Sequence, residues 1–131
     1  MTYFPTVKLV TDRTPIQPLT QLSSLLGIDL WIKRDDLAGT TLGGNKARQL
    51  EYYLGAAVAE KADTILITGA VQSNFVRIAA ASAASLGMQT VIQLEDRVDR
   101  DDLIYRQSGN VLLNSIFGSR VIYYPHGEDE N

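Results

Sequence analysis

A strand-helix-strand pattern in the middle of the chain is the feature that most constrains its fold. Residues 64–68 form a compact β-branched run, residues 74–86 form a long helical stretch of small residues that ends at Gly87, and residues 90–94 form a second β-prone run. Two consecutive strands joined by a helix build a βαβ unit, in which the strands are parallel and the crossover is right-handed. The pattern therefore predicts an α/β fold.

Helical and β-prone patterns continue on both sides of this unit. In chain order, the expected elements outside it are a helix over 19–26, a strand over 30–32, a helix over 46–61, a helix over 101–117 and a strand over 121–124. Gly27 suits the residue that closes the first of these helices, Asn45 suits the N-cap of the second, and residues 108–110 weaken the middle of the third. We expect a three-layer αβα domain with a small, mainly parallel sheet of about four strands.

Length and composition indicate one α/β unit spanning 1–131. The chain has 131 residues, of which 45% are hydrophobic and 21% charged, so it can bury the core of one domain and not of two. No segment approaches the roughly 18 consecutive apolar residues of a membrane span, and the first residues lack a signal-peptide pattern. These features predict a cytoplasmic protein without membrane contact.

Charge and cysteine content exclude several classes of function. Twelve Lys and Arg against fifteen Asp and Glu give a formal net charge of -3, which leaves no basic excess for binding a nucleic-acid backbone. The chain contains no cysteine and a single histidine, His126, near its end. We therefore expect no disulfide, no thiol nucleophile, no Ser-His hydrolase and no metal site.

The first candidate site is the string Gly43-Gly44-Asn45-Lys46 at the predicted start of a helix. The glycines let another group approach the backbone, and the positive end of a helix dipole disfavours the charged form of a lysine amine. An uncharged amine at Lys46 would be a nucleophile suited to Schiff-base formation with an aldehyde. From spacing alone, a surface lysine beside a flexible turn is the simpler interpretation.

The second candidate site lies at 68–74, where a strand ends and a helix begins. Ligands of open α/β folds bind at this carboxyl edge of the sheet. Free N–H groups around Asn74, Phe75 and Val76, together with the Ser73 hydroxyl and the Asn74 side-chain amide, would receive a carboxylate or a phosphate. Ser73 would also serve as an ordinary helix cap, and the two roles are compatible.

Three further features have simpler explanations than a site. The charged group 33–36 is typical of a salt-bridge cluster at a strand end, although it could place a functional carboxylate pair. Arg77 could face an anion, but an exposed helix arginine is the ordinary case. His126 lies beside Gly127 in a polar tail and is expected to be solvated.

Three blocks, taken together in their order and spacing, resemble one family. Residues 31–37 (WIKRDDL), 43–51 (GGNKARQLE) and 69–74 (GAVQSN) resemble the N-terminal part of the pyridoxal-phosphate family that contains 1-aminocyclopropane-1-carboxylate deaminase, D-cysteine desulfhydrase and L-cysteate sulfo-lyase. The likeness extends over residues 14–125. It implies the tryptophan synthase β-like fold, of which this chain would be the N-terminal portion and small domain, and pyridoxal 5'-phosphate as the cofactor.

The resemblance also implies roles for individual residues. Lys46 would hold the cofactor covalently, and Asn74 would hydrogen-bond the 3-hydroxyl of its pyridine ring. Ser73 and nearby backbone amides, including that of Phe75, would receive the substrate carboxylate, and the matching serine of the cyclopropane-opening branch also lies near the reacting carbon. The implied reaction is an elimination from a small amino acid that gives a 2-oxo acid and ammonia, with Lys46 as the proton shuttle.

The chain departs from the family in two ways. Family members are much longer, and the second domain, which forms their phosphate cup, is expected to be absent from this sequence. The glycines after Asn74 are isolated and form no phosphate-binding loop. Phe75 stands where the family usually carries a polar residue, often His or Gln, so the identity of the substrate stays open.

Two hypotheses follow for the function. In the first, the chain is the N-terminal part or a subunit of a pyridoxal-phosphate-dependent lyase or deaminase resembling D-cysteine desulfhydrase, completed by a partner chain or within a homo-oligomer. In the second, it is a non-catalytic relic or an interaction subunit that binds no cofactor alone. Both predict a large exposed apolar face. Retention of Lys46, Ser73 and Asn74 together favours the first, and the lack of a GxGxxG sequence after a strand disfavours a dinucleotide-binding function.

Overall fold

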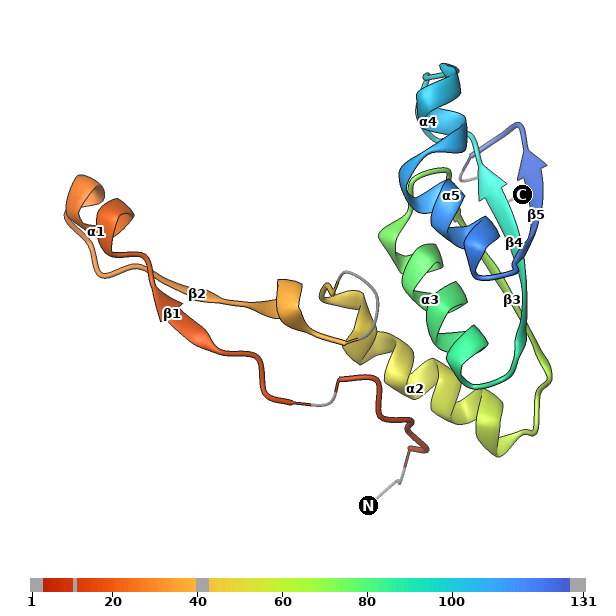
Figure 1. Ribbon diagram of the computed structural model, residues 1–131, viewed down its shortest axis with the longest axis horizontal. Helices are drawn as coiled ribbons and strands as arrows, with labels where there is room; N and C mark the ends of the chain where they lie inside the picture. The colour runs from red at the N-terminus through yellow and green to blue at the C-terminus, as the bar shows by residue number, and fades with distance from the viewer. Residues whose placement is uncertain (1–3, 11, 40–42, 128–131) are drawn as a thin grey trace.

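The chain forms an α/β body and a narrow arm that projects from it (Figure 1). This computed structural model describes residues 4–10, 12–39 and 43–127. The arm contains a two-stranded antiparallel sheet, and the body contains a three-stranded parallel sheet with its helices. In chain order, the elements are β1 (Ile16–Pro18), α1 (Thr20–Leu26), β2 (Trp31–Lys33), the 3-10 helix η1 (Asp35–Leu37), α2 (Lys46–Ala59), β3 (Thr64–Ala70), α3 (Asn74–Ser85), β4 (Gln89–Glu95), α4 (Leu103–Gln107), α5 (Gly109–Ile116) and β5 (Arg120–Tyr124).

The parallel sheet has the order β3-β4-β5, so its strands are neighbours in the order in which they occur along the chain. Leu66 pairs with Val91, and Gln93 pairs with Ile122. Helix α3 connects the first two strands, and α4 and α5 connect the second two, as in successive βαβ units. The predicted α/β class with a small parallel sheet is therefore confirmed.

The strand expected over 30–32 does not join the parallel sheet. It forms β2, which pairs antiparallel with β1. Backbone hydrogen bonds from Leu19 N to Leu30 O (2.9 Å) and from Arg34 N to Pro15 O (3.0 Å) extend this pairing. Helix α1 reverses the chain between the two strands, so β1 is the partner nearest in sequence. The described parallel sheet accordingly has three strands rather than about four.

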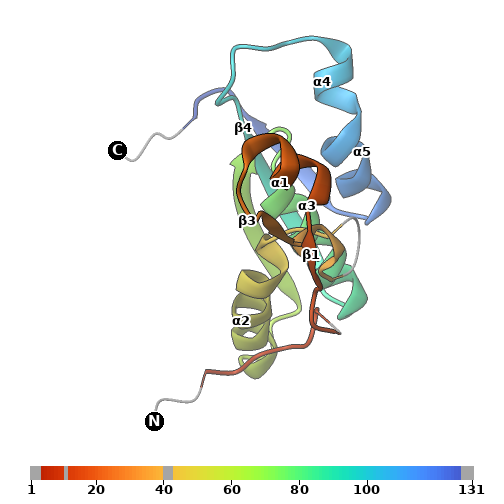
Figure 2. The same cartoon turned by 90° about the vertical axis from the view of Figure 1, so that its left-hand side faces the viewer.

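Helices cover one face of the parallel sheet. Ile92 and Leu94 of β4 lie in one buried cluster with Val76 of α3, and α5 lies on one side of the strands (Figure 2). On the opposite face, Leu66 is 78% exposed and Ile122 is 46% exposed. The described residues therefore form the sheet and one of the two helical layers expected around it.

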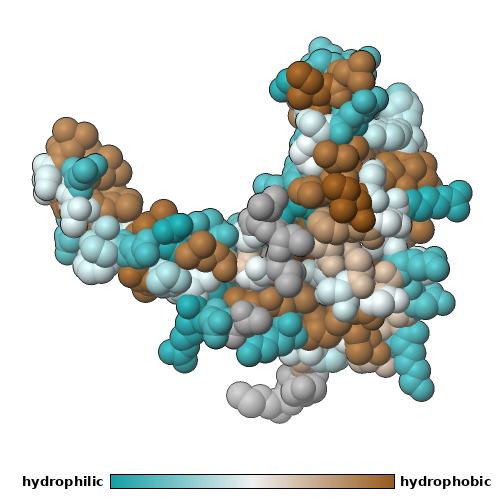
Figure 3. All heavy atoms as spheres, in the orientation of Figure 1, coloured by the Kyte–Doolittle hydropathy of each residue, from teal (hydrophilic) through white to brown (hydrophobic). Residues whose placement is uncertain are grey.

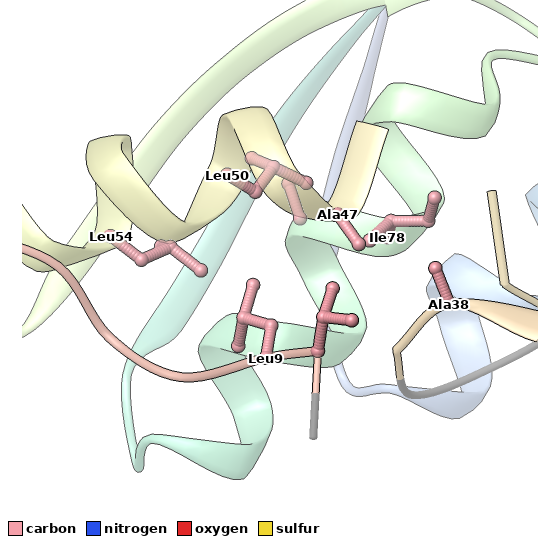
Figure 4. Close-up of a cluster of buried hydrophobic side chains, with 8 residues drawn as sticks. Leu9, Ala38, Ala47, Leu50, Leu54 and Ile78 are labelled. Atoms are coloured by element: carbon pink, nitrogen blue, oxygen red, sulfur yellow. The ribbon is translucent and has the colours of Figure 1, made fainter. Parts of the chain in front are cut away.

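A second core cluster joins α2 to α3 and to the N-terminal segment. Leu50 and Leu54 of α2 face Leu9 and Ile78 in the buried interior (Figure 4). Burial of each leucine side chain stabilises the fold by about 1.5–3 kcal/mol. Ala47 at the start of α2 belongs to the same cluster and is 1% exposed, so packing fixes the first turn of α2 beside α3.

The N-terminal segment is held along α2 by hydrogen bonds. The Glu51 carboxylate accepts hydrogen bonds from the backbone N–H groups of Leu9 (3.0 Å) and Val10 (2.9 Å). The segment passes so close to the helix that a Cβ on Gly55 would lie 2.4 Å from the carbonyl oxygen of Pro5. This close approach explains a glycine in the interior of α2.

Most helix ends follow the sequence signals. Gly27 closes α1 with a left-handed φ of 67°, and the helix expected over 101–117 is broken at Ser108, which ends α4 and precedes α5. Asn45 occupies the N-cap position of α2, but its backbone is helical and its side chain caps no N–H. A capping side chain needs an extended backbone to reach back to the helix, so the capping role predicted for Asn45 was wrong.

The arm exposes apolar side chains. Leu25 and Leu26 of α1 are 79% and 55% exposed, and apolar residues gather at the tip of the arm (Figure 3). A two-stranded hairpin is only marginally stable by itself in water. The arm and the open sheet face together provide the exposed apolar surface that the sequence predicts. No helix in the described part of the chain is long and apolar enough to cross a membrane.

Candidate functional site

The two candidate sites predicted from the sequence meet in one hollow at the carboxyl edge of the parallel sheet. Its volume is about 620 Å³. The hollow lies where β3 ends and α3 begins, with the start of α2 on one side and the segment after β4 on the other. The residues that line it are Lys46, Gln49, Thr68, Gly69, Ala70, Gln72, Ser73, Phe75, Arg97, Val98 and Tyr105.

A glycine turn brings Lys46 to this hollow. Gly43 and Gly44 have φ values of 60° and 121°, which L side chains rarely adopt. The Gly44 N–H donates to the backbone carbonyl of Asp35 (2.9 Å), which ties the turn to the segment after β2. Lys46 is the first residue of α2 and is exposed, while the next residue is buried in the core. The lysine amine is therefore accessible to a ligand although its backbone is firmly packed.

The charged group 33–36 forms the ion pairs that its sequence suggests. Arg34 and Asp36 pair at 2.7 Å. The Thr14 hydroxyl donates to the Asp35 carboxylate (2.7 Å), and Arg48 lies 3.4 Å from the same oxygen. The Thr14 hydrogen bond, assisted by Arg48 and opposed by burial, lowers the pKa of Asp35 below its ordinary value of 3.8. These contacts hold in place the segment whose Asp35 backbone carbonyl accepts the hydrogen bond from Gly44.

Ser73 caps α3. Its backbone is extended, and its hydroxyl accepts a hydrogen bond from the N–H of Val76 (3.3 Å). Gly69 lies against this cap, because a Cβ on Gly69 would lie 2.7 Å from Val76 Cγ2 and 3.2 Å from Ser73 Oγ. The predicted cap is therefore confirmed. Ser73 also lines the hollow, so its hydroxyl can serve both purposes.

Asn74 lies beside the hollow and is not among the described residues that line it. Its side chain is turned toward α5, where the Asn110 Nδ2 group donates to the Asn74 Oδ1 atom (3.0 Å). Arg77, one turn further along α3, donates to the same oxygen at 3.4 Å. The structure thus brings Lys46 and Ser73 to one hollow and places Asn74 at its border.

Phe75 supplies an aromatic wall of the hollow. Its ring lies edge-on to that of Tyr53, with centroids 6.3 Å apart and an interplanar angle of 78°. Across the hollow, Arg97 forms an ion pair with Glu95 (2.7 Å), and the Thr68 hydroxyl donates to the same carboxylate. The wall on one side is apolar, and the wall on the other is charged.

The surroundings of two residues near the site were not predicted from the sequence. Arg77, for which an exposed position was the ordinary expectation, is only 4% exposed, and burial lowers its pKa. Gln72 was not singled out, yet its side chain donates to the backbone carbonyls of Tyr105 and Ser108 and accepts from the N–H of Asn110. The sequence signal that could have indicated this role of Gln72 is the glycine-containing helix break at 108–110, with which its side chain forms hydrogen bonds. His126 is exposed, as predicted.

An accessible lysine and a capped helix start at the carboxyl edge of a parallel sheet define a small-ligand site of the α/β class. A family model described as "Pyridoxal-phosphate dependent enzyme" matches residues 7–131. The chain belongs to this family, as its motifs predict, and pyridoxal phosphate is the cofactor of the family.

Individual relatives agree with this family. The chain is 41% identical over its whole length to a D-cysteine desulfhydrase of Yersinia pestis, covering 40% of that protein. It is 44% identical over 96% of its length to a 1-aminocyclopropane-1-carboxylate deaminase of Burkholderia multivorans, covering 38% of that protein. The chain thus spans about 40% of the length of the D-cysteine desulfhydrase that it matches.

Solved structures confirm the tryptophan synthase β-like fold. A crystal structure of an ACC deaminase homologue superposes with a TM-score of 0.85 at 38% identity, covering 95% of this chain and 36% of that one. The processed form of threonine deaminase isoform 2 from Solanum lycopersicum superposes with a TM-score of 0.68 at 20% identity, covering 92% of this chain and 30% of that one. The second likeness concerns the fold alone.

The residues of the hollow fit one side of pyridoxal phosphate. Lys46 offers the primary amine that an aldehyde requires, and the hollow lies within the roughly 300–1,000 Å³ typical of ligand pockets. Gly69 has no side chain, so a ligand can approach its backbone closely, and the start of α3 offers polar groups. The glycines of the described residues after Asn74 are single and make no cradle for a phosphate group.

Proposed function

We propose that residues 1–131 are the lysine-bearing part of a pyridoxal-phosphate-dependent lyase or deaminase that acts on a small amino acid. The reaction would resemble that of D-cysteine desulfhydrase, an elimination that yields a 2-oxo acid and ammonia. The observation that carries this proposal is that Lys46 and Ser73, which come from two separate sequence motifs, line the same hollow. The identities to a D-cysteine desulfhydrase and to a deaminase support it.

Lys46 has two tasks in this proposal. Its Nζ atom would hold pyridoxal phosphate covalently, and its amine would carry a proton to and from the substrate carbon. When bound, pyridoxal phosphate supplies an aldehyde that condenses with amines and a ring that withdraws electrons from the carbon attached to the amine. The packing of Ala47 fixes the backbone of Lys46 beside the hollow, so its amine can reach a ligand there for both tasks.

The start of α3 binds the substrate carboxylate. The N–H groups of Asn74 and Phe75 lie in the first turn of the helix, where they have no partner within the helix. Together with the Ser73 hydroxyl they offer donors at the positive end of the helix dipole. The Asn74 side chain would donate to the 3-oxygen of the cofactor. The Phe75 ring adds no polar contact, so the substrate carboxylate relies on Ser73 and on backbone groups.

The remaining part of the cofactor site, including the phosphate cradle, would come from residues outside 1–131, in the same polypeptide, in another copy or in a partner chain. The exposed apolar residues of the open sheet face and of the arm support such a covering layer, since Leu66 and Leu25 are 78% and 79% exposed. In this proposal the described part is the N-terminal portion and the small domain of the enzyme.

An absorbance titration with pyridoxal phosphate tests the proposal. We expect a band near about 410–430 nm that shifts on addition of D-cysteine and is lost in Lys46→Ala. Lys8→Ala, which removes another exposed lysine, is the matched control and should keep the band. A Lys46-dependent band that is still missing once this chain is joined with the residues that supply the phosphate cradle would contradict the proposal and favour a subunit that binds no cofactor.

A further inference from the structure

The orientation of the Asn74 side chain is fixed from outside its own helix. Its Oδ1 atom accepts one hydrogen bond from Asn110 Nδ2 (3.0 Å) and a second from Arg77 Nη2 (3.4 Å). A carboxamide oxygen accepts two hydrogen bonds, and its NH₂ group only donates. With the oxygen engaged by two donors, the NH₂ group is the end that Asn74 presents to a ligand.

Asn110 is itself held in place by the turn that leads to α3. Its backbone N–H donates to Gln72 Oε1 (2.9 Å), and its side-chain Nδ2 also donates to the Gln72 backbone carbonyl (2.8 Å). Gln72 Nε2 in turn donates to the carbonyl of Ser108 (3.0 Å). Because Gln72 is two residues before Asn74, this network joins the break between α4 and α5 directly to the candidate site.

Gly109 is what lets the two segments meet. It has a φ of 57°, and a Cβ on it would lie 2.8 Å from Gln72 Oε1. A side chain at this position would therefore displace the Gln72 carboxamide, which accepts the hydrogen bond from the Asn110 backbone N–H. The helix break at 108–110 is thus the geometry that delivers a donor to Asn74.

We propose that Asn110 is a positioning residue, which orients the Asn74 carboxamide so that its NH₂ group donates to the 3-oxygen of pyridoxal phosphate. This inference rests on the proposed function of the site. A donor at that oxygen stabilises its ionised form, whereas a carbonyl oxygen turned toward it would repel the ionised form. Asn110 is not among the described residues that line the hollow, so it would act through Asn74.

The variant Asn110→Asp tests this assignment with almost no change in shape. A carboxylate cannot donate, so the oxygen of Asn74 loses its donor on α5 and its NH₂ group turns toward the new charge. Asn110→Ala removes the donor without attracting the NH₂ group and should have a smaller effect. Gln107→Glu makes the same amide-to-carboxylate change at an exposed position of α4 and is the matched control.

The first measurement needs no cofactor. In ¹⁵N NMR spectra of the protein without pyridoxal phosphate, the side-chain amide signal of Asn74, assigned by its loss in Asn74→Asp, should shift in Asn110→Asp and stay in place in Gln107→Glu. Thermal unfolding of the same samples shows whether the variants remain folded. An Asn74 signal that is the same in a folded Asn110→Asp as in the unmodified protein overturns the inference.

The second measurement uses the full-length protein loaded with pyridoxal phosphate. Cofactor affinity should fall about tenfold in Asn110→Asp and less in Asn110→Ala, since a hydrogen bond to a charged group is lost. The pH at which the absorbance of the bound cofactor changes should rise in the same order. Equal affinity and an equal pH midpoint in Asn110→Asp and in the unmodified protein overturn the inference.

A lack of cofactor binding by the unmodified protein contradicts the proposed function instead. The NMR result then still decides whether Asn110 orients Asn74.

Discussion

A Cβ atom on Gly43 would lie 1.7 Å from the carbonyl oxygen of Asp36, so the turn that delivers Lys46 can close only with glycine at position 43. Gly43→Ala should therefore shift the turn and weaken cofactor binding by the full-length protein. It should also cost more stability than the roughly 1–2 kcal/mol of left-handed strain alone. Gly27→Ala is the control, because Gly27 has a φ of 67° and nothing within 4 Å of a Cβ. Urea unfolding that gives equal losses for both variants would contradict the close contact.

The covalent role proposed for Lys46 predicts a chemical trap. Borohydride reduction of the cofactor-loaded protein should attach the mass of the cofactor to the peptide that contains Lys46, as seen by mass spectrometry. Lys46→Arg keeps the positive charge but lacks a primary amine that forms an imine, so it should not be labelled. Labelling of a different lysine in the unmodified protein would place the covalent site elsewhere.

The two roles of Ser73 can be separated by three substitutions. Ser73→Ala should lower the unfolding free energy by about 1 kcal/mol through loss of the cap, whereas Ser73→Gly should lower it by only a few tenths. Both remove the hydroxyl, so both should raise the KM for the amino acid to a similar degree. Ser73→Thr should restore most of both properties. A KM that follows stability across the three variants would mean that Ser73 acts only as a cap.

The lowered pKa of Asp35 predicts a dependence of stability on pH. Because the folded-state pKa lies below the unfolded value of 3.8, the contribution of Asp35 is fully present above that pH. It is lost as the pH falls through the lower folded-state pKa. Thr14→Val removes the largest cause of the shift and should raise the pKa of Asp35. NMR titration of the Asp35 carboxyl checks this, and an unchanged midpoint would assign the shift to Arg48 instead.

Gly55→Ala tests the packing of the N-terminal segment against α2, because that packing decides whether the substitution raises or lowers stability. Replacing a helix-interior glycine by alanine usually stabilises a protein by about 0.5–1 kcal/mol. Gly55→Ala should instead destabilise it, because the added Cβ would lie 2.4 Å from the backbone of Pro5 and Thr6. Urea unfolding measures the difference. A stabilised variant would show that the N-terminal segment does not lie against α2 in solution.

The elements of the body could be predicted from the sequence because their signals are local. The β-branched run at 64–68 and the small residues that follow it determine a strand and a helix irrespective of the rest of the chain. Gly27 and Ser73 end and begin helices through their own backbone and side-chain geometry. The same local signals placed Lys46 and Ser73 at element ends, and those ends meet at one hollow because α2 packs against α3.

What the sequence did not predict depends on contacts between distant segments. The composition of the short strand β2 does not reveal its partner, and its antiparallel pairing depends on β1 and on the reversal of the chain in α1. Arg77 follows no apolar pattern, yet packing around α3 buries it. Gln72 and Asn110 are 38 residues apart, and nothing in either residue alone indicates that they form hydrogen bonds with each other.

The strand order of the parallel sheet has a consequence for how the protein is made. Because β3, β4 and β5 are neighbours in the order of synthesis, β4 and β5 each follow their partner strand in the chain and are separated from it only by the intervening helices. Loop closure between such neighbours has a low entropic cost, and the nascent chain emerges from the ribosome slowly enough for each unit to dock in turn. We therefore expect the sheet to assemble during translation, before any covering layer reaches its open face.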